Sequence, residues 1–517
     1  MLAPPPTRPS DSVPRELASG PATHPALQAA CISTLIGCAF LLLLKLTPDL
    51  PGGYDAYRHV KLASRLISEP AQVFKDPWHL AYFWPKPVDP WFGYHLLLAP
   101  FTTVFDLITA VKLLSAILFG AMAYVLFLLL HRLDARYPAA WVLLALTGSG
   151  VTLNRATLTR PFLLSLLLTL LVALFTLKNK PVKVFVLSAL HAASYSIFFL
   201  PAMVPGIWLL LRRDRQSTRT VLVCAAGIAL GVFANPYFPE NLRYDLFQAR
   251  VPDVAVHAHV EIGGELDPVK SWWWLATSLP ILFVWIPAVV VHISTWRRLQ
   301  RAVPASSAKS SINLLLAASV VTFVATIRVV RTTDFFVPFA VLFAAAVLAP
   351  RLSAWRRNLP YAAIPLALLC AIYVYLTCQY ALAAPSLARF RGASEYLRTH
   401  APGELVANAQ WGDYQFLYFL NTQNRYLVGI EPTMMYRIDP RKYWLWRHIS
   451  DDETATCDVE HCAERQDIAG AIRTELGARY VFAEHIANPR LEAVLKHTRG
   501  VSEVYRDDGF SVFYIER

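Results

Sequence analysis

Long apolar runs joined by short basic loops constrain this chain more than any other feature. An α-helix needs about 20 apolar residues to cross the hydrocarbon core of a bilayer. Only 16% of the 517 residues are charged, against about 25% in soluble domains. We therefore expect a polytopic α-helical membrane protein with about eleven spans, at 28–47, 108–130, 139–154, 161–177, 183–198, 199–211, 219–236, 272–294, 311–327, 334–350 and 359–381.

Basic residues gather in five short connections between these runs: HRLDARY, KNKPVK, RRDRQSTR, WRRLQR and RLSAWRRN. Counting spans from a cytoplasmic N-terminus places all five connections in the cytoplasm, as the positive-inside rule requires. The net charge of +12 then reflects loops that meet anionic lipid, and nucleic acid is not an expected partner. The polar, proline-rich residues 1–27 are predicted to be a disordered cytoplasmic tail.

This orientation leaves the loops 48–107 and 237–271 outside the cytoplasm, together with everything after the last span. The transmembrane domain covers 28–384. From residue 385 the chain is polar and alternates strand-like stretches (RYLVGI, ARYVFAEH, FSVFYIE) with helix-like ones (EYLRTH, DIAGAIRTELG). We expect an extracytoplasmic α/β domain over 385–517. Within it, Cys457 and Cys462 could form a disulfide in an oxidising space or, less in keeping with their surroundings, bind a metal.

The segment PGGYDAYRHVKLASRLI, residues 51–67, directly follows the first apolar run. One interpretation is an interfacial belt, with rings at the headgroups and basic groups on phosphates, formed by Tyr54, Tyr57, Arg58 and Lys61. The other begins with Asp55, because a carboxylate at the mouth of a membrane cavity can act as a general base or hold a divalent cation. In a helix, Asp55 and His59 share one face.

The second external loop carries HAHVE followed by Glu265. On a strand, His257, His259 and Glu261 would share one face, with the spacing of zinc ligands. The alternatives are a gating loop, in which Glu261 or Glu265 reaches the site, and a solvated loop without a role.

Two arginines, Arg328 and Arg331, lie at the outer end of a predicted span. Charge at the rim of a membrane segment is costly and marks function by default. Because a guanidinium group binds phosphate well, we interpret the pair as a phosphate clamp. The alternative is an ion pair with Asp334 on the same helix.

Several of these residues form motifs that resemble those of a known protein family. A first span, then D-x-Y-x-H at Asp55, Tyr57 and His59, then W-P-x-P from Trp84, resembles the membrane-embedded C-type glycosyltransferases (the GT-C superfamily) and, among them, the catalytic subunits of oligosaccharyltransferases. The stretch from Asp76-Pro-Trp to Val88 is similar to their D-P-W…Y-P…P-V pattern. AQWGDYQF, 409–416, is similar to their W-W-D-Y-G motif, and RVVRTTDFFVPFAVLFAAA, 328–346, resembles their arginine-bearing penultimate spans.

The resemblance implies an inverting transfer of a sugar from a polyprenyl-phosphate donor to a glycan, lipid or protein acceptor outside a bacterial plasma (inner) membrane. Asp55 would be the catalytic carboxylate or the ligand of Mg²⁺ or Mn²⁺. The substrates would be bound by His59, Arg160, Glu265, Arg328, Arg331, Trp411 and Asp413. The segment LNRATLTRPFLLS, 153–165, lacks the family's second acidic motif, and WGDYQ lacks one tryptophan and the glycine. A monosaccharide transferase therefore fits better than an oligosaccharyltransferase.

Two rival functions remain open from the sequence. A transporter or flippase of a lipid-linked saccharide needs ionisable residues or broken helices near the middle of the membrane, for which the candidates are Lys112, His191, Pro201 and Pro205. A non-catalytic scaffold of the same fold would be consistent with the missing acidic motif.

Overall fold

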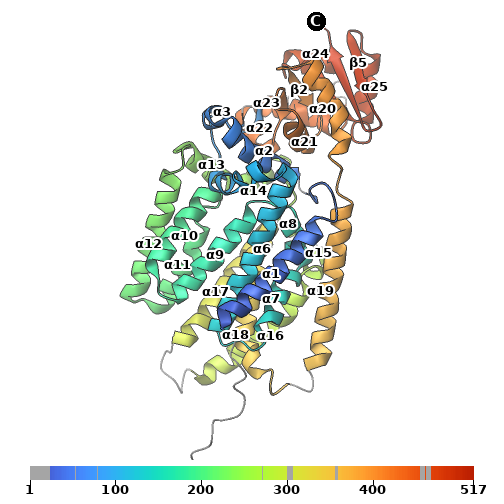
Figure 1. Ribbon diagram of the computed structural model, residues 1–517. Helices are drawn as coiled ribbons and strands as arrows, with labels where there is room; N and C mark the ends of the chain where they lie inside the picture. The colour runs from blue at the N-terminus through green and yellow to red at the C-terminus, as the bar shows by residue number, and fades with distance from the viewer. Residues whose placement is uncertain are drawn as a thin grey trace, which may run out of the picture.

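The computed structural model describes residues 24–52, 54–78, 80–269, 272–299, 307–355, 359–453, 460 and 467–516. A bundle of apolar helices carries a sheet-containing domain over one end, and shorter helices lie between the two parts (Figure 1). The predicted cysteine pair, Cys457 and Cys462, lies outside the described residues, as do residues 1–23 of the predicted tail.

Each of the eleven predicted spans contains an apolar helix. In the described part of the chain, six segments are long and apolar enough to cross a membrane, and they include α1 (Pro25–Leu44), α6 (Leu107–Arg132), α12 (Arg215–Phe233), α17 (Ser307–Arg328), α18 (Thr333–Leu348) and α19 (Leu359–Leu382). Shorter apolar helices are α7 (Pro138–Thr147), α9 (Phe162–Leu177), α10 (Pro181–Ser194), η1–α11 (Leu200–Ala202, Met203–Arg212) and α16 (Leu279–Leu299). The number of membrane crossings stays a prediction.

Helices α18 and α19 mark the centre and the edge of the bundle. Every residue of α18 is buried, as expected for a helix that is apolar all round and surrounded by protein. In α19 only Tyr373, Thr377 and Ala381 are buried. Figure 1 shows α19 along the side of the bundle, from which it leads directly into the C-terminal domain.

Small residues allow α10 and α12 to approach closely. A Cβ atom on Gly227 or Gly231 of α12 would collide with the backbone carbonyl oxygens of Phe185 and Ala189 on α10. Glycine at helix contacts in membranes permits this kind of backbone approach. The pairing fixes α12, which forms one wall of an apolar groove described below.

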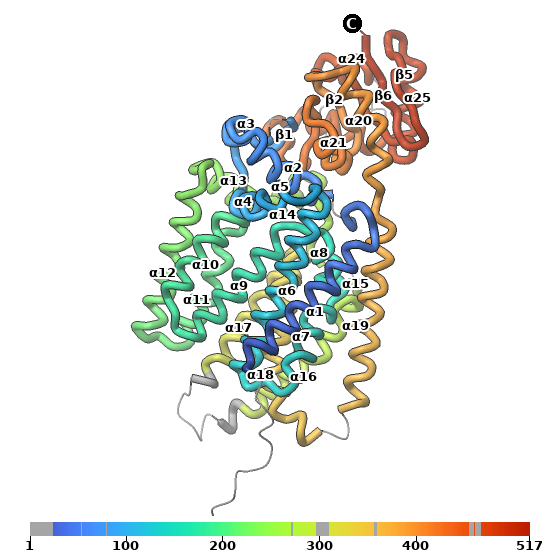
Figure 2. Tube along the Cα trace, in the orientation of Figure 1, coloured from blue at the N-terminus to red at the C-terminus, as the bar shows by residue number. Residues whose placement is uncertain are grey.

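Three of the predicted basic loops meet at the end of the bundle opposite the sheet (Figure 2). Arg132 donates a hydrogen bond to the carbonyl of Leu177 (2.7 Å), and a small cavity is lined by Arg132, Asn179 and Arg212 together. The predicted orientation requires these loops on one side and the C-terminal domain on the other, and the fold has this arrangement. The orientation in a membrane remains a prediction.

The two loops predicted to be external fold into short helices between the bundle and the sheet (Figures 1 and 2). Residues 48–107 form α2 (Tyr54–Ser68), α3 (Pro70–Lys75), β1 (Ala81–Tyr82), α4 (Phe92–Leu98) and α5 (Phe101–Val104). Residues 237–271 form α13 (Glu240–Gln248) and α14 (Val251–Ala258). The bundle also contains α8 (Gly150–Thr157) and α15 (Trp272–Ala276), and short η2 (Val330–Thr332) and η3 (Ala349–Arg351) turns flank α18.

The described C-terminal residues form a sheet with the order β1-β3-β2-β4-β6-β5. Pairing is parallel from β1 through β4 and antiparallel for β4–β6–β5. The strands are β2 (Leu405–Asn408), β3 (Arg425–Val428), β4 (Tyr480–Glu484), β5 (Val501–Arg506) and β6 (Phe510–Ile515). The helical segments are α20 (Ala388–His400), η4 (Trp411–Asp413), α21 (Tyr414–Leu420), α22 (Pro432–Ile438), α23 (Pro440–Ser450), α24 (Ile468–Thr474) and α25 (Pro489–His497).

The edge strand β1 comes from the first external loop. Ala81 pairs with Tyr426 and Tyr82 with Val428 of β3. The loop that leaves the first span is therefore hydrogen-bonded into the C-terminal sheet, which the sequence did not predict. This pairing fixes the loop between the bundle and the domain.

Candidate functional site

A cavity of about 500 Å³ lies where the bundle, the external loops and the C-terminal domain meet. Seven of the eight predicted site residues line it: Asp55, His59, Arg160, Glu265, Arg331, Trp411 and Asp413. The eighth, Arg328, is exposed in the last turn of α17 and does not line this cavity.

Helix α2 brings Asp55, Arg58 and His59 to the cavity wall. Asp55 lies in the first turn of α2, where the helix dipole favours a carboxylate. Its Oδ2 is 3.1 Å from Arg160 Nη1, and its Oδ1 is 3.6 Å from Arg58 Nη2. Asp55 is thus tied both to its own helix and to the turn that precedes α9.

The interfacial-belt interpretation is wrong for the centre of this segment. Tyr57 and Arg58 are buried, with 1% and 2% of their surfaces exposed. The Tyr57 hydroxyl accepts a hydrogen bond from the amide of Leu50 (3.1 Å), and the Arg58 guanidinium lies over the rings of Trp78 and Trp91. Both side chains point into the protein because α2 packs between the bundle and the C-terminal domain.

Glu265 is the centre of an ion cluster. Its Oε2 accepts hydrogen bonds from Arg155 and, at 2.9 Å, from Arg160 Nη1, while its Oε1 lies 3.6 Å from Arg331 Nη1. Burial alone would raise the pKa of this carboxyl. The three guanidinium groups outweigh burial and hold the pKa of Glu265 well below its ordinary value, so the carboxylate is charged.

Backbone hydrogen bonds hold the loop that carries Glu265. The amides of Val330 and Arg331 donate to the carbonyls of Asp267 and Glu265 (both 3.0 Å), and the amide of Val269 donates to Ile327 (3.2 Å). This loop segment is anchored along the start of η2. Glu265 and Arg331 therefore approach the cavity as one unit.

One interpretation of the sequence paired Arg331 with Asp334. In the structure, Asp334 pairs with a different arginine. Arg155 Nε donates to Asp334 Oδ2 (2.8 Å), so Arg155 joins Asp334 to Glu265. Arg331 instead donates from Nη2 to the hydroxyl of Tyr195 (2.6 Å). Arg331 is thus held at the cavity by Tyr195 of the bundle rather than by Asp334.

The C-terminal domain supplies the opposite wall, which includes Trp411, Asp413 and Glu431. Among the described residues, Asp413 Oδ2 and Glu431 Oε1 are buried polar atoms without a hydrogen-bond partner. Burial, then the nearby Glu484, raises the pKa of Asp413 well above its ordinary value. Burial, then Glu265 and Asp55, raises the pKa of Glu431 to about 8. Asp413 and Glu431 are therefore neutral near neutral pH, whereas the bundle wall carries charges.

The sequence missed several residues of the site. Arg58, Arg155, Tyr195 and Tyr244 line the cavity with no spacing pattern that sets them apart, and Glu431 stands alone before α22. A detectable signal was the repeat of Asp-Pro-Trp at Asp76 and Asp89. The second copy places Asp89 against His95, next to His59.

The described residues contain no group of three or more His, Cys, Asp or Glu side chains placed to hold a metal ion. Asp55 and Glu265, two carboxylates that line the cavity, both contact Arg160 Nη1. The side chains as arranged therefore do not fit a divalent cation, because a guanidinium group already occupies the position between the two carboxylates.

The predicted zinc face of HAHVE is also absent, because the segment is not a strand. His257 lies in the last turn of α14 and bonds to the carbonyl of Asp253 (2.7 Å), while His259 has a left-handed backbone (φ 51°). Glu261 instead forms an ion pair with Arg447 of the C-terminal domain. These side chains diverge and do not gather around one point.

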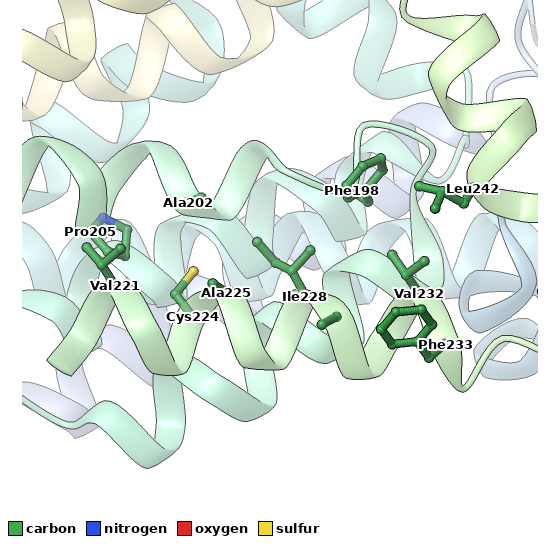
Figure 3. Close-up of a pocket in the computed structure, with 11 residues that line it drawn as sticks. Phe198, Ala202, Pro205, Val221, Cys224, Ala225, Ile228, Val232, Phe233 and Leu242 are labelled. Atoms are coloured by element: carbon green, nitrogen blue, oxygen red, sulfur yellow. The ribbon is translucent and has the colours of Figure 1, made fainter. Parts of the chain in front are cut away.

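An apolar groove of about 310 Å³ runs along α12 (Figure 3). Val221, Cys224, Ile228 and Val232 follow one another along this helix, and Pro205 and Ala202 face them from η1–α11. Unlike the polar cavity, the groove offers no charged group.

Two residues that line the groove lie close in the chain to residues that line the polar cavity. Phe198 and Leu242 line the groove. Ser196, two residues before Phe198, and Tyr244, two residues after Leu242, line the polar cavity. The two spaces are therefore lined by the same two segments of the chain.

The architecture has relatives among solved structures. The oligosaccharyltransferase of Archaeoglobus fulgidus, tethered by a disulfide to an acceptor peptide with an NVT sequon, superposes with a TM-score of 0.59 at 14% identity, over 95% of this chain and 74% of that one. The complex of that enzyme with Zn and sulfate gives 0.58 at 10% identity, over 92% and 70%. The mycobacterial arabinofuranosyltransferase AftD gives 0.56 at 15% identity, over 94% of this chain and 41% of that one.

The chain has the GT-C fold. The resemblance inferred from the Asp55 motif is therefore confirmed, and it extends over nearly the whole chain. No family model and no curated protein matches the sequence. At these identities the GT-C likeness shows the fold, and the chemistry has to be argued from the cavity.

The ionisable residues that a transporter would use have structural partners inside the GT-C bundle. Lys112 donates to the carbonyl of Thr47 (2.7 Å), and His191 bonds to Ser165 (2.8 Å). Neither Lys112 nor His191 lines the polar cavity or the apolar groove.

Proposed function

We propose that this protein is a membrane glycosyltransferase that moves a sugar from a polyprenyl-phosphate donor to an acceptor outside the cytoplasm. The observation that carries the proposal is the polar cavity itself. Arginines converge on it from helix α2, helix α8, the following turn and η2, and the same bundle carries an apolar groove along α12. A polyprenyl-phosphate sugar matches this combination, because it has an anionic phosphodiester head and a long apolar chain.

The phosphate of the donor would bind at Arg155, Arg160 and Arg331. Guanidinium groups bind phosphate oxygens in a bidentate manner and stay charged when buried. Arg58, with two buried nitrogens unpaired among the described side chains, can also turn toward an anion. The exposed Arg328 is kept only as a headgroup contact at the rim.

The lipid chain of the donor would lie in the groove along α12. Burying apolar surface contributes roughly 25 cal/mol per Å², so a groove contact can hold the donor without any polar interaction. The chain would then leave the groove for the bilayer between α11 and α12.

The acceptor would bind against the C-terminal domain, where Trp411 offers a ring and Asp413 and Glu431 offer neutral carboxyl groups. An aromatic face with a few polar groups is typical of sites for small polar ligands. A sugar hydroxyl can donate to or accept from a protonated carboxyl, so this wall suits a glycan or lipid-linked glycan acceptor.

The reaction would be one displacement. The oxygen of the acceptor hydroxyl forms a bond to the anomeric carbon, the bond from that carbon to the phosphate oxygen breaks, and the lipid phosphate keeps the electron pair. One displacement inverts the configuration of the carbon. The arginines stabilise the leaving phosphate, and Asp55 stabilises the positive charge that develops on the sugar ring.

A reconstituted transfer assay tests the proposal. The purified protein in sealed proteoliposomes would receive radiolabelled polyprenyl-phosphate sugars and a glycan acceptor extracted from the membranes of its host. We expect the label to move to the acceptor and the co-purifying lipid to be a polyprenyl phosphate by mass spectrometry. Movement of intact donor across the bilayer without transfer would indicate a flippase, and absence of both activities would indicate a scaffold.

A membrane orientation with the N-terminus in the cytoplasm and the C-terminal domain outside belongs to the same proposal. It is supported by the basic loops that meet at one end of the bundle and by the cavity that lies at the other. Nucleotide sugars are absent from that outer side, which makes a lipid-linked donor the practical one.

A further inference from the structure

Three buried side chains form a hydrogen-bonded line that ends at the cavity. His59 Nδ1 lies 2.7 Å from His95 Nε2, and His95 Nδ1 lies 2.6 Å from Asp89 Oδ2. The three residues are at most 1% exposed. His59 alone of the three lines the cavity.

We propose that His59 accepts the proton of the attacking acceptor hydroxyl through Nε2, and that Asp89 and His95 fix His59 in the tautomer that makes this possible. The inference deepens the proposed glycosyl transfer and rests on it. His59 would be the catalytic residue, whereas His95 and Asp89 would be positioning residues.

The tautomers of His59 and His95 follow from their hydrogen-bond partners. An ionised carboxylate only accepts hydrogen bonds, so His95 Nδ1 must carry a proton that it donates to Asp89. His95 Nε2 is then a bare acceptor, and His59 Nδ1 must donate to it. In a neutral ring this leaves His59 Nε2 without a proton, and its lone pair is free to accept one at the cavity wall.

The surroundings of His59 keep the ring neutral before the reaction. Burial, then the neighbouring Arg58 and His95, lowers the pKa of His59 well below its ordinary value. The positive charges that contribute to this lower pKa of His59 are those of Arg58 and Arg160. The Nε2 lone pair is therefore available at neutral pH.

Burying a line of polar groups destabilises the folded state, so its presence in the core indicates a function. Burying a carboxylate costs several kcal/mol, which hydrogen bonds only partly offset. Asp89 Oδ1 is also satisfied, because it accepts from the amide of Trp91 (3.0 Å). Both oxygens of Asp89 are thus oriented, and the carboxylate has one fixed direction toward His95.

The proton balance closes within this line. As the acceptor oxygen bonds to the anomeric carbon, the proton of its hydroxyl passes to His59 Nε2. The resulting imidazolium is stabilised through His95 by the charge of Asp89. The lipid phosphate departs with the electron pair, and His59 later returns the proton to that phosphate or to water.

The substitution Asp89→Asn gives a sharp test because the structure dictates how the amide would sit. Its carbonyl oxygen would stay on the amide of Trp91, which leaves its NH₂ group facing His95 Nδ1. The NH₂ group can only donate, so both histidines would switch tautomer. His59 would then present an N–H to the cavity in place of a lone pair.

Nitrogen-15 NMR of histidine-labelled protein in nanodiscs measures this directly, without substrate. We expect an unprotonated Nε2 for His59 in the wild type, assigned by the loss of its signal in His59→Gln, and a protonated Nε2 in Asp89→Asn. A protonated Nε2 in the wild type, or an unchanged tautomer in Asp89→Asn, overturns the proposal.

The kinetic arm uses the transfer assay. We expect kcat to fall about 10²-fold or more in His59→Gln and in Asp89→Asn, with a smaller change in the KM of the acceptor. The matched control is His191→Gln, which removes another fully buried histidine that bonds to Ser165 and does not line the cavity. It should change kcat less than about twofold.

The two arms separate the inference from the function it rests on. If the wild type transfers no sugar, the proposed function fails, while the NMR arm still reports the tautomer. If the wild type transfers sugar and Asp89→Asn retains full kcat, glycosyl transfer stands and the role of His59 fails.

Discussion

Arg160 binds Asp55 through an ion pair of 3.1 Å between Nη1 and Oδ2. The same nitrogen lies 2.9 Å from Glu265 Oε2. One guanidinium group therefore joins helix α2, the turn before α9 and the second external loop at one point of the cavity. Arg160 balances the charge of the site. Without it, the carboxylates of Asp55 and Glu265 would repel each other in the low-dielectric interior.

Asp55→Asn should reduce kcat by about 10²-fold or more in the transfer assay. The amide keeps the size of the side chain and removes the charge that faces the reacting sugar. Folding should change little, since the Asp55 side chain is 19% exposed and Arg160 keeps its contact with Glu265. Full activity in purified Asp55→Asn protein would show that the carboxylate has no catalytic role.

Asp413→Asn is the matched comparison and should be nearly silent. Burial raises the pKa of Asp413 well above its ordinary value, so its carboxyl is neutral at pH 7 and an amide has nearly the same shape and polarity. We expect less than about a threefold change in kcat or in the KM of the acceptor. Asp413→Leu, which removes the polar group, should instead raise that KM without lowering kcat in proportion.

Chelation should leave the transfer rate within about twofold of its starting value. The position between Asp55 and Glu265 is filled by Arg160, which already supplies a positive charge there. The measurement is the rate after dialysis against EDTA, with and without added Mg²⁺ or Mn²⁺. A rate that falls at least tenfold and returns with one cation would mean that the metal displaces Arg160 from the carboxylates.

Much of the fold was predictable because hydropathy is a local signal. Each of the eleven apolar runs contains a helix, and the strand-like stretches RYLVGI, ARYVFAEH and FSVFYIE became β3, β4 and β6. Strand β1 was not predictable. It has two residues, lies in an aromatic loop and exists only because Tyr426 of a distant strand pairs with Ala81.

The site was predictable where a residue type was unusual for its place. A carboxylate after a span and an arginine at the rim of a span stand out because of their cost. Arg328 and Arg331 looked alike on this criterion, and only the η2 turn separates an exposed side chain from one that points to the cavity. Arg155 and Glu431 gain their roles from residues far away in the chain, which spacing cannot reveal.

Filling the groove should weaken binding of the lipid donor. Ala225 lines the groove, whereas Ala226, the next residue of α12, does not, so the same change to tryptophan at the two positions is a matched pair. We expect Ala225→Trp to raise the KM of a long-chain donor about tenfold and to leave that of a short-chain, water-soluble donor unchanged. Ala226→Trp should alter neither KM.

Equal effects of Ala225→Trp on both donors would mean that the groove does not hold the lipid chain. Thermal unfolding of both variants, followed by tryptophan-independent light scattering, shows whether the larger side chain has merely disturbed the contact between α10 and α12.

Glu431→Gln should stabilise the protein at alkaline pH more than at acidic pH. The folded state raises the pKa of Glu431 from 4.5 to about 8, first through burial and then through Glu265 and Asp55. Below about pH 4.5 the carboxyl is protonated in both folded and unfolded chains, and the folded state has its full stability. As pH rises toward 8, the unfolded chain ionises freely while the folded one resists, so wild-type stability falls.

Glutamine is neutral at every pH and escapes this loss. We expect the difference in Tm between Glu431→Gln and wild type to grow from near zero at pH 4.5 to on the order of 5 °C at pH 8.5, and then to level off. The control is Glu475→Gln, at an exposed position of the same domain, for which the difference should not vary with pH. A pH-independent difference for Glu431→Gln as well would mean that its carboxylate is already ionised in the folded protein, and the acceptor wall would then be anionic rather than neutral.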